Sequence, residues 1–225
     1  LPSTQKPIHY RPFLVKEEKL LVLALESEDI KDITTAIKNV IKACIKTRGI
    51  KVENLPTFDI EYLFLNIRGK SVGEDIEVNL ICPDDKKTQV PVTISIDDVQ
   101  IKRTEGHTNK IKLDSSLMME MKYPSLAEFI KNNFDFNEEN VMDQSFDLIA
   151  SCIDKIYNEE EVWATADCTK KEISTFLESM NTTQFKEIEK FFETMPKLSH
   201  KVKITNPNTK VESEVVMEGL SSFFG

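Results

Sequence analysis

The residues of this chain best suited to metal binding or nucleophilic chemistry are four cysteines and three histidines. No two cysteines fall in a Cys-x-x-Cys spacing, and His9, His107 and His200 are dispersed, with no cysteine nearby. A structural zinc site needs four such ligands, and zinc ribbons hold them in pairs at hairpin tips. One expected hairpin tip carries Cys82 alone, and the other carries neither residue type. We therefore expect no metal site and interpret Cys82 as a thiol at the end of a strand.

Thiol and carboxylate catalysis have equally little support. Cys44 and Cys152 fall on apolar helical faces, where a buried thiol behaves as a small hydrophobe. Cys168 precedes an expected helix N-terminus, which lowers a thiol pKa, but the sequence assigns it no base. Paired carboxylates such as Glu138–Glu139 lie at helix starts, turns and polar faces, where solvation accounts for them. We expect no catalytic residue, and a thiol- or metal-dependent enzyme is the alternative from that class.

Cofactor and redox signals point the same way. The chain has six glycines, and the near pair Gly69 and Gly73 lacks the rest of a dinucleotide or P-loop pattern. We therefore expect no nucleotide cofactor. Scattered cysteines in a chain with a sizeable core are typical of reduced thiols in a cytosol-like compartment.

Composition argues against two further classes of protein, although it leaves room for a local basic patch. The 225 residues include 40% hydrophobic residues, enough for a core, and the formal net charge is −9. A general nucleic-acid binder needs a basic footprint, so we expect no nucleic-acid partner. The longest apolar runs, such as Leu20 to Leu25, are far shorter than the about 20 residues of a membrane span, so we expect none. The N-terminal residues show no signal-peptide pattern.

The first part of the chain predicts amphipathic helices followed by β-hairpins. Apolar residues recur at three- and four-residue steps along the helical segments, and apolar and polar residues alternate along the strands. A Pro-rich segment, Leu1 to Pro12, includes a candidate edge strand at residues 6–11. The expected helices are residues 15–25, 29–48 (stopped by Arg48-Gly49) and 57–69; the expected strand pairs are 76–81 with 90–96, extended by 99–102, and 110–113 with 117–123.

The second part returns to helices and ends in a hairpin. Ser125 with Glu128 and Thr169 with Glu172 have the spacing of capping boxes, which mark helix starts. The expected helices are a short one from Ser125, a long one from 137 or 138 to Tyr157, and two at 169–180 and 181–196, with an acidic connector at 159–163. The final hairpin is 200–205 with 211–217, followed by a helical turn at 219–224.

This order predicts an α+β fold of amphipathic helices with two or three antiparallel β-hairpins. We divide the chain into an N-terminal helical and hairpin region, residues 1–123, and a C-terminal helical region with a terminal hairpin, residues 124–225. Methionines on one strand and phenylalanines near the C-terminus are mostly core candidates, although Phe223 and Phe224 are hard to bury there. An exposed apolar patch would mark an interface. By elimination, the residues favour an interaction or assembly protein.

Several stretches then resemble a known family. Residues 10–19 (YRPFLVKEEK) and 58–65 (FDIEYLFL), with Arg68 and Ser71-Val72-Gly73, are similar to the baseplate hub subunit family of T4-like contractile-tailed phages. Met121-Lys122-Tyr123-Pro124 and the closing residues 218–224 (EGLSSFF) fit the same family. The resemblance runs from near residue 1 to the end.

The resemblance implies a late phage protein used to build the central hub of the tail baseplate, without enzymatic activity. Its expected partners are hub and tape-measure proteins, met in the bacterial host cytoplasm during assembly. The alternative is a transient assembly chaperone that is absent from the mature virion, and the oligomeric state stays open. The expected partner-binding residues are Arg11, Phe13, Lys16, Phe223 and Phe224.

Overall fold

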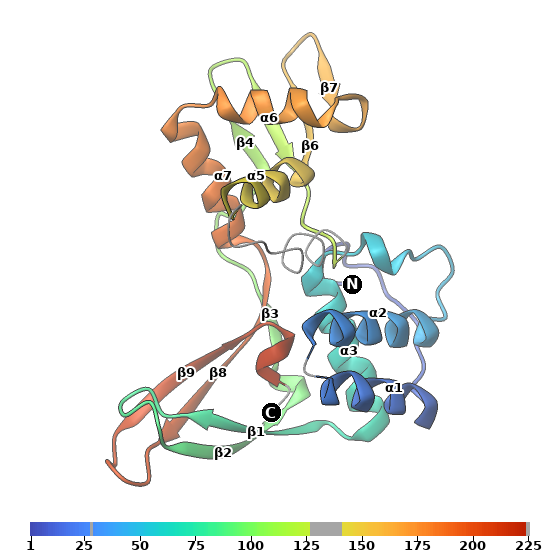
Figure 1. The fold of residues 1–225 in the computed structure, drawn as a ribbon, viewed down its shortest axis with the longest axis vertical. Coiled ribbons are helices and arrows are strands. Elements are labelled where there is room, and N and C mark those ends of the chain that lie inside the picture. Colours follow the sequence, from blue (N-terminus) through green and yellow to red (C-terminus); the bar gives the residue numbers. More distant parts are fainter. Residues whose placement is uncertain (28, 127–140, 224–225) are drawn as a thin grey trace. The chain divides into compact units, whose positions relative to one another are not determined.

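The computed structural model describes residues 1–27, 29–126 and 141–223 (Figure 1). The fold is α+β, as the sequence predicts, with helices beside antiparallel sheets. The end of the predicted helix from Ser125, the start of the predicted long helix and Phe224 lie outside the described residues. No helix in these ranges is long and apolar enough to cross a membrane.

The chain forms two compact units, and each is discontinuous in sequence. Unit 1 comprises Leu1–Val52, Phe58–Lys102 and Pro196–Gly225. Unit 2 comprises Glu53–Thr57 and Arg103–Met195. We predicted a single boundary between residues 123 and 124. Each of these compact units instead consists of segments that are separated in the sequence.

Unit 1 begins with helices α1 (Val15–Glu26), α2 (Ile30–Cys44) and α3 (Thr57–Val72), and a short 3₁₀ turn, η1 (Val52–Asn54), precedes α3. The Asp29 carboxylate caps α2 by accepting the Lys31 N–H at 2.7 Å. The predicted end of α2 at Arg48-Gly49 is wrong, because the helix stops at Cys44. Ile45 is extended there and bridges Tyr10, so a backbone pairing replaces the last predicted turn.

Two antiparallel sheets complete unit 1, with both predicted hairpins confirmed. The first pairs β1 (Asp75–Ile81) with β2 (Gln89–Ser95), and the second has the order β3 (Gln100–Lys102), β8 (Lys197–Thr205), β9 (Glu212–Glu218). The predicted extension of the first hairpin by residues 99–102 is wrong. The 3₁₀ turn η2 (Ile96–Asp98) ends that hairpin, and β3 pairs with β8 instead. A 3₁₀ turn, η5 (Leu220–Phe223), follows β9.

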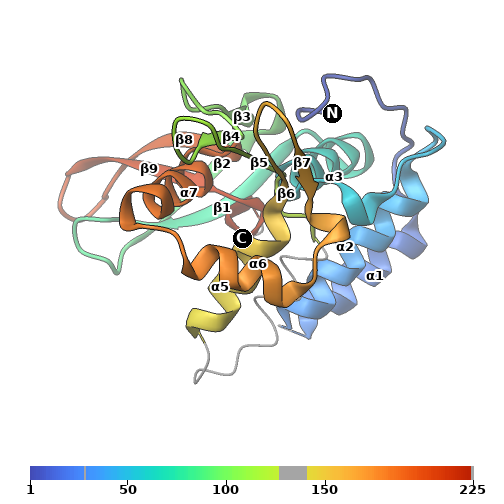
Figure 2. The same cartoon turned by 90° about the horizontal axis from the view of Figure 1, so that it is seen from above.

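Within the residues that the structure describes, unit 2 joins one antiparallel sheet to three helices (Figure 2). The sheet order is β4 (Lys110–Lys112), β5 (Met118–Met121), β6 (Ile153–Tyr157), β7 (Val162–Ala164). The helices are α5 (Val141–Cys152), α6 (Lys170–Glu178) and α7 (Thr182–Thr194), with the 3₁₀ turn η4 (Thr165–Asp167) before α6. The predicted capping box of Thr169 and Glu172 is confirmed at the start of α6, and Asn181 caps α7 in the same way.

One predicted element has the wrong type. The long helix expected to reach Tyr157 ends at Cys152, and the next five residues form β6. β6 lies between β5 and β7, so its backbone groups are paired on both sides. The β-branched and aromatic residues Ile153, Ile156 and Tyr157 suit a pleated sheet, and this pairing outweighs the helical spacing of the isoleucines.

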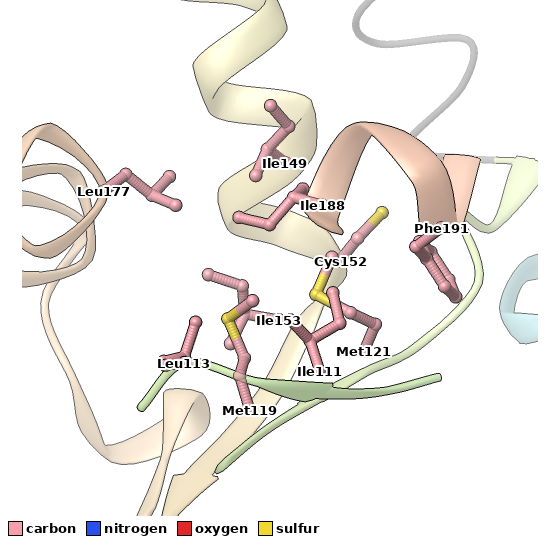
Figure 3. Close-up of a cluster of buried hydrophobic side chains, with 10 residues drawn as sticks. All are labelled: Ile111, Leu113, Met119, Met121, Ile149, Cys152, Ile153, Leu177, Ile188 and Phe191. Atoms are coloured by element: carbon pink, nitrogen blue, oxygen red, sulfur yellow. The ribbon is translucent and has the colours of Figure 1, made fainter. Parts of the chain in front are cut away.

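The core of unit 2 lies between its sheet and its helices (Figure 3). Met119 and Met121 project from β5 and Ile153 from β6, and all three are almost fully buried. The helices contribute large side chains to the same cluster, so one face of the sheet is covered. The cluster comprises Ile111, Leu113, Met119, Met121, Ile149, Cys152, Ile153, Leu177, Ile188 and Phe191.

Candidate functional site

Arg11, one of the predicted contact residues, is held by a carboxylate of its own chain. Its Nη2 lies 2.9 Å from Glu17 Oε1 and its Nη1 lies 3.2 Å from Oε2, a bidentate pair. The Glu17 residue is only 3% exposed. The hydrogen bond from Arg11 lowers the pKa of Glu17, and the pKa of Arg11 is raised in return. Arg11 therefore fixes the approach of the chain to α1.

The rest of the N-terminal segment is tied to α2 and α3. The Arg11 N–H donates to the Cys44 carbonyl at 3.0 Å, beside the bridge between Tyr10 and Ile45. The Phe13 N–H donates to Ser71 Oγ at 2.9 Å, which anchors the backbone while the ring stays half-buried. Phe13, the second predicted contact residue, lies on the segment that leads into α1, and its backbone is positioned by α3.

The first helix exposes apolar side chains over most of its circumference. Lys16, the third predicted contact residue, is exposed at its start, and Val15 beside it is 80% exposed. A helix that is apolar all round is normally buried. Only Glu17 and Ala24 are buried in α1, so the remaining apolar surface forms a patch of the kind that marks an interface. The exposed apolar residues here are Leu14, Val15, Leu20, Val22, Leu23 and Leu25.

Phe223 lies elsewhere, in η5, and its side chain is inside unit 1. The residue is 1% exposed, so its ring would reach a partner only by leaving this site. The preceding Gly219 has a positive φ of 73° and its N–H donates to the Leu198 carbonyl at 3.0 Å, which turns the chain away from β9. The predicted neighbour Phe224 is outside the described residues.

The tips of the two hairpins of unit 1 are joined by side chains. The Asn206 amide nitrogen lies 3.1 Å from both carboxylate oxygens of Asp84 and 3.0 Å from Asp85 Oδ2. Thr209 donates its hydroxyl to Asp84 as well, and these bonds, led by Thr209, lower the pKa of Asp84. Hydrogen bonds from Thr88 lower the pKa of Asp85. Side-chain hydrogen bonds therefore connect the loop between β1 and β2 to the loop between β8 and β9.

His107, in unit 2, has both ring nitrogens within hydrogen-bond distance of hydroxyl groups. Its Nδ1 lies 2.9 Å from Thr194 Oγ1, and its Nε2 lies 3.0 Å from Tyr123 Oη. Thr194 donates its hydroxyl to the Lys190 carbonyl, so it accepts from Nδ1–H, and Nε2 accepts from Tyr123. Burial lowers the pKa of His107 and raises that of Tyr123. This arrangement holds a neutral imidazole.

The four cysteines are free thiols, and three of them are buried. Cys44 and Cys152 are buried, as predicted, and burial raises the pKa of Cys44 and of Cys82. Cys168 is half-buried, with its thiol donating to the Ala164 carbonyl at 3.5 Å. In the part of the chain described, no three residues of metal-ligating type come together.

Sequence reasoning missed two features of these surfaces. The exposure of α1 had a local signal, because six apolar residues in a row at Leu20 to Leu25 cannot all face one side of a helix. The bond between Asn206 and Asp84 had none, because either residue alone is typical of a turn.

Comparison with known protein families identifies a match. A family model described as T4 bacteriophage base plate protein matches residues 1–225, the full length given. No curated protein and no solved structure matches the chain significantly.

Proposed function

Because this chain belongs to the T4 bacteriophage base plate protein family, we propose that it is a non-catalytic protein that helps to assemble the central hub of the baseplate. Membership gives it a structural or assembly role in the phage tail, among other base plate proteins. The finer proposal is that its partners are hub and tape-measure proteins and that it meets them in the host cytoplasm. It acts there through protein–protein contacts.

The apolar surface of α1 is the observation that carries this proposal. Leu23 and Leu25 are exposed on its C-terminal half, although α1 also packs on α2. An assembly protein buries such residues against a partner. This burial supplies a favourable hydrophobic free energy that the isolated chain lacks. The rigid attachment of the preceding segment to α3 presents the helix in one orientation, which lowers the entropic cost of binding.

Co-expression with the hub and tape-measure proteins of the same phage tests the proposal. We expect a complex on size-exclusion chromatography, and we expect Leu23→Ser to weaken it about tenfold, as for an interface residue of moderate weight. Val72→Ser is the matched control, because Leu23 and Val72 are both 52% exposed on helices of unit 1. Failure to bind any hub or tape-measure protein would contradict the hub proposal.

Two further measurements separate the versions of this function. Mass spectrometry of purified tails distinguishes a resident subunit, present in stoichiometric copies, from an assembly chaperone, which is absent. Metal analysis and thiol titration of the pure protein test the alternative of a thiol- or metal-dependent enzyme, which stoichiometric zinc would revive.

A further inference from the structure

Charge is distributed unevenly along this chain. Residues 1–52 carry ten lysines and arginines against six acidic residues, a net charge of +4, whereas the whole chain has −9. Residues 1–16 and 33–52 contain no acidic residue. Backbone hydrogen bonds join these two stretches, with the Lys46 N–H donating to the His9 carbonyl at 2.8 Å. Arg11 Nη1 lies 3.2 Å from Glu17 Oε2 in α1 and 3.7 Å from Cys44 Sγ at the end of α2. The start of α1 and the end of α2 therefore lie close together, in this basic part of the chain.

Exposed apolar residues share this basic part of the chain. Leu14 and Val15 are exposed at the start of α1, with the exposed Lys16 and Lys19 following them. Glu18 is also exposed here, while Glu17 is buried against Arg11. Two more exposed cations, Lys46 and Arg48, follow the end of α2. We call this surface, formed by residues 14–19 with 46–48, the basic end.

The β6–β7 hairpin of unit 2 has the opposite character. Its tip carries Glu159, Glu160 and Glu161, all exposed, and residues 153–167 hold five acidic residues against one lysine, a net of −4. Val162 is 64% exposed and Trp163 41% exposed on β7. We call this surface, residues 159–163, the acidic tip.

The acidic tip is also built to meet a partner. β7 lies at the edge of its sheet, and Val162 and Trp163 point to opposite faces of it, so apolar surface wraps around that edge. Asn158 Oδ1 accepts the N–H groups of Glu160 and Glu161 at 2.8 and 2.7 Å, which fixes the backbone of the turn. Tryptophan is one of the residue types enriched among the energetic centres of interfaces.

We propose that two copies of this chain associate head to tail, with the basic end of one copy receiving the acidic tip of the next. Each surface combines exposed apolar side chains with an excess of one charge. The excess is positive at the basic end, where Lys16, Lys19, Lys46 and Arg48 outnumber the exposed Glu18, and negative at the acidic tip. The apolar residues supply affinity, and the charges supply orientation and reject like-charged pairings. This partner goes beyond the proposed function and does not depend on a hub protein.

The joint is heterologous, because the two surfaces differ. A heterologous joint leaves one free surface at each end of a pair, so further copies add until a ring closes or the supply ends. Sedimentation velocity on the pure protein tests this. We expect the average mass to rise above 25.8 kDa with concentration and to fall toward it as salt is added.

Two variants each remove one half of the joint. Val15→Glu places a carboxylate in the basic end, and Val162→Lys places a cation in the acidic tip, at an edge strand that tolerates lysine. We expect each variant alone to associate at least about tenfold more weakly than the parent. A mixture of the two restores association but stops at a dimer, because one intact joint remains between the unlike copies.

The matched controls are Val72→Glu on α3 and Val216→Lys on β9, exposed valines outside both surfaces. They keep the parental association, and circular dichroism confirms that all four variants fold. A parent that stays monomeric at every concentration overturns the proposal. So does a mixture that fails to form dimers, which points to a like-with-like joint, or controls that weaken association equally.

Discussion

Asn206 and Asp84 are 122 positions apart in sequence, yet the amide of one lies 3.1 Å from both carboxylate oxygens of the other. Asn206 is 1% exposed, so its polar atoms depend on partners within the protein. An unpaired buried amide costs folding free energy. The Asn206 amide nitrogen is the hydrogen-bond donor that Asp84 and Asp85 share, so it holds both carboxylates close to it. The two hairpins of unit 1 are therefore joined at their far ends as well as through the fold.

Replacement of Asn206 should show the strength of that connection. We expect Asn206→Ala to lower the free energy of unfolding by about 1–3 kcal/mol, because it removes the shared donor and leaves both aspartates without it. Asn208→Ala is the control, since that exposed side chain donates to Thr88 Oγ1 at 3.0 Å and to neither aspartate. Urea denaturation compares them, and equal losses would contradict a special role for Asn206.

Glu17 should make the protein sensitive to acid. Its pKa lies below the ordinary value of 4.5 in the folded state, chiefly through the hydrogen bond from Arg11, so its stabilising contribution is present above that pH and is lost as pH falls. We expect Glu17→Gln to be less stable than the parent at neutral pH, with the difference shrinking in acid. Denaturation midpoints across this range measure it, and a difference that is constant with pH would exclude the ion pair as its cause.

His107 should produce a second pH dependence at higher pH. Burial lowers its pKa from 6.5, so the folded state prefers the neutral ring, and stability is full above about 6.5 and falls below it. His107→Gln should flatten this slope, because it removes the ring that takes up the proton. Thermal unfolding at a series of pH values supplies the comparison, and an unchanged slope in His107→Gln would assign the effect to another group.

Phe223 should behave as a core residue. Its ring is almost fully buried, so we expect Phe223→Ala to cost about 3–5 kcal/mol of unfolding free energy. Phe13→Ala should cost less, because that ring is half-buried. Denaturant titration measures both, and a stable Phe223→Ala protein that fails to bind its partners would instead support the contact role predicted from sequence.

The hairpins of this fold were predictable because their pattern is local. Ile76, Val78 and Ile94 alternate with polar residues and are buried in the structure, so period-two spacing is enough to identify both strands. The same holds for the helices that begin at Thr169 and Asn181, where a side chain three residues ahead completes the cap.

The errors arose where distant pairing decides the structure. Ile153 and Ile156 have helical spacing with the isoleucine before them, and only the strands on either side make them β6. Ile45 likewise leaves α2 because Tyr10 bridges it, and β3 joins β8 from across the chain. The sequence around each of these residues gives no local signal of its distant partner. The acidic tip and the basic end could likewise be identified only from the solvent exposure of their side chains in the structure.

The passage of the chain from unit 1 into unit 2 and back has a consequence for synthesis. Gln100 on β3 pairs with Ser199 on β8, which is 99 positions later in the sequence. All residues of unit 2 are synthesised before Ser199, because unit 2 ends at Met195. The inserted unit can thus fold on the nascent chain while β3 still lacks its neighbour. Unit 1 is completed last during translation. A chain that stops before β8 would therefore contain the segments of unit 2 but an incomplete unit 1.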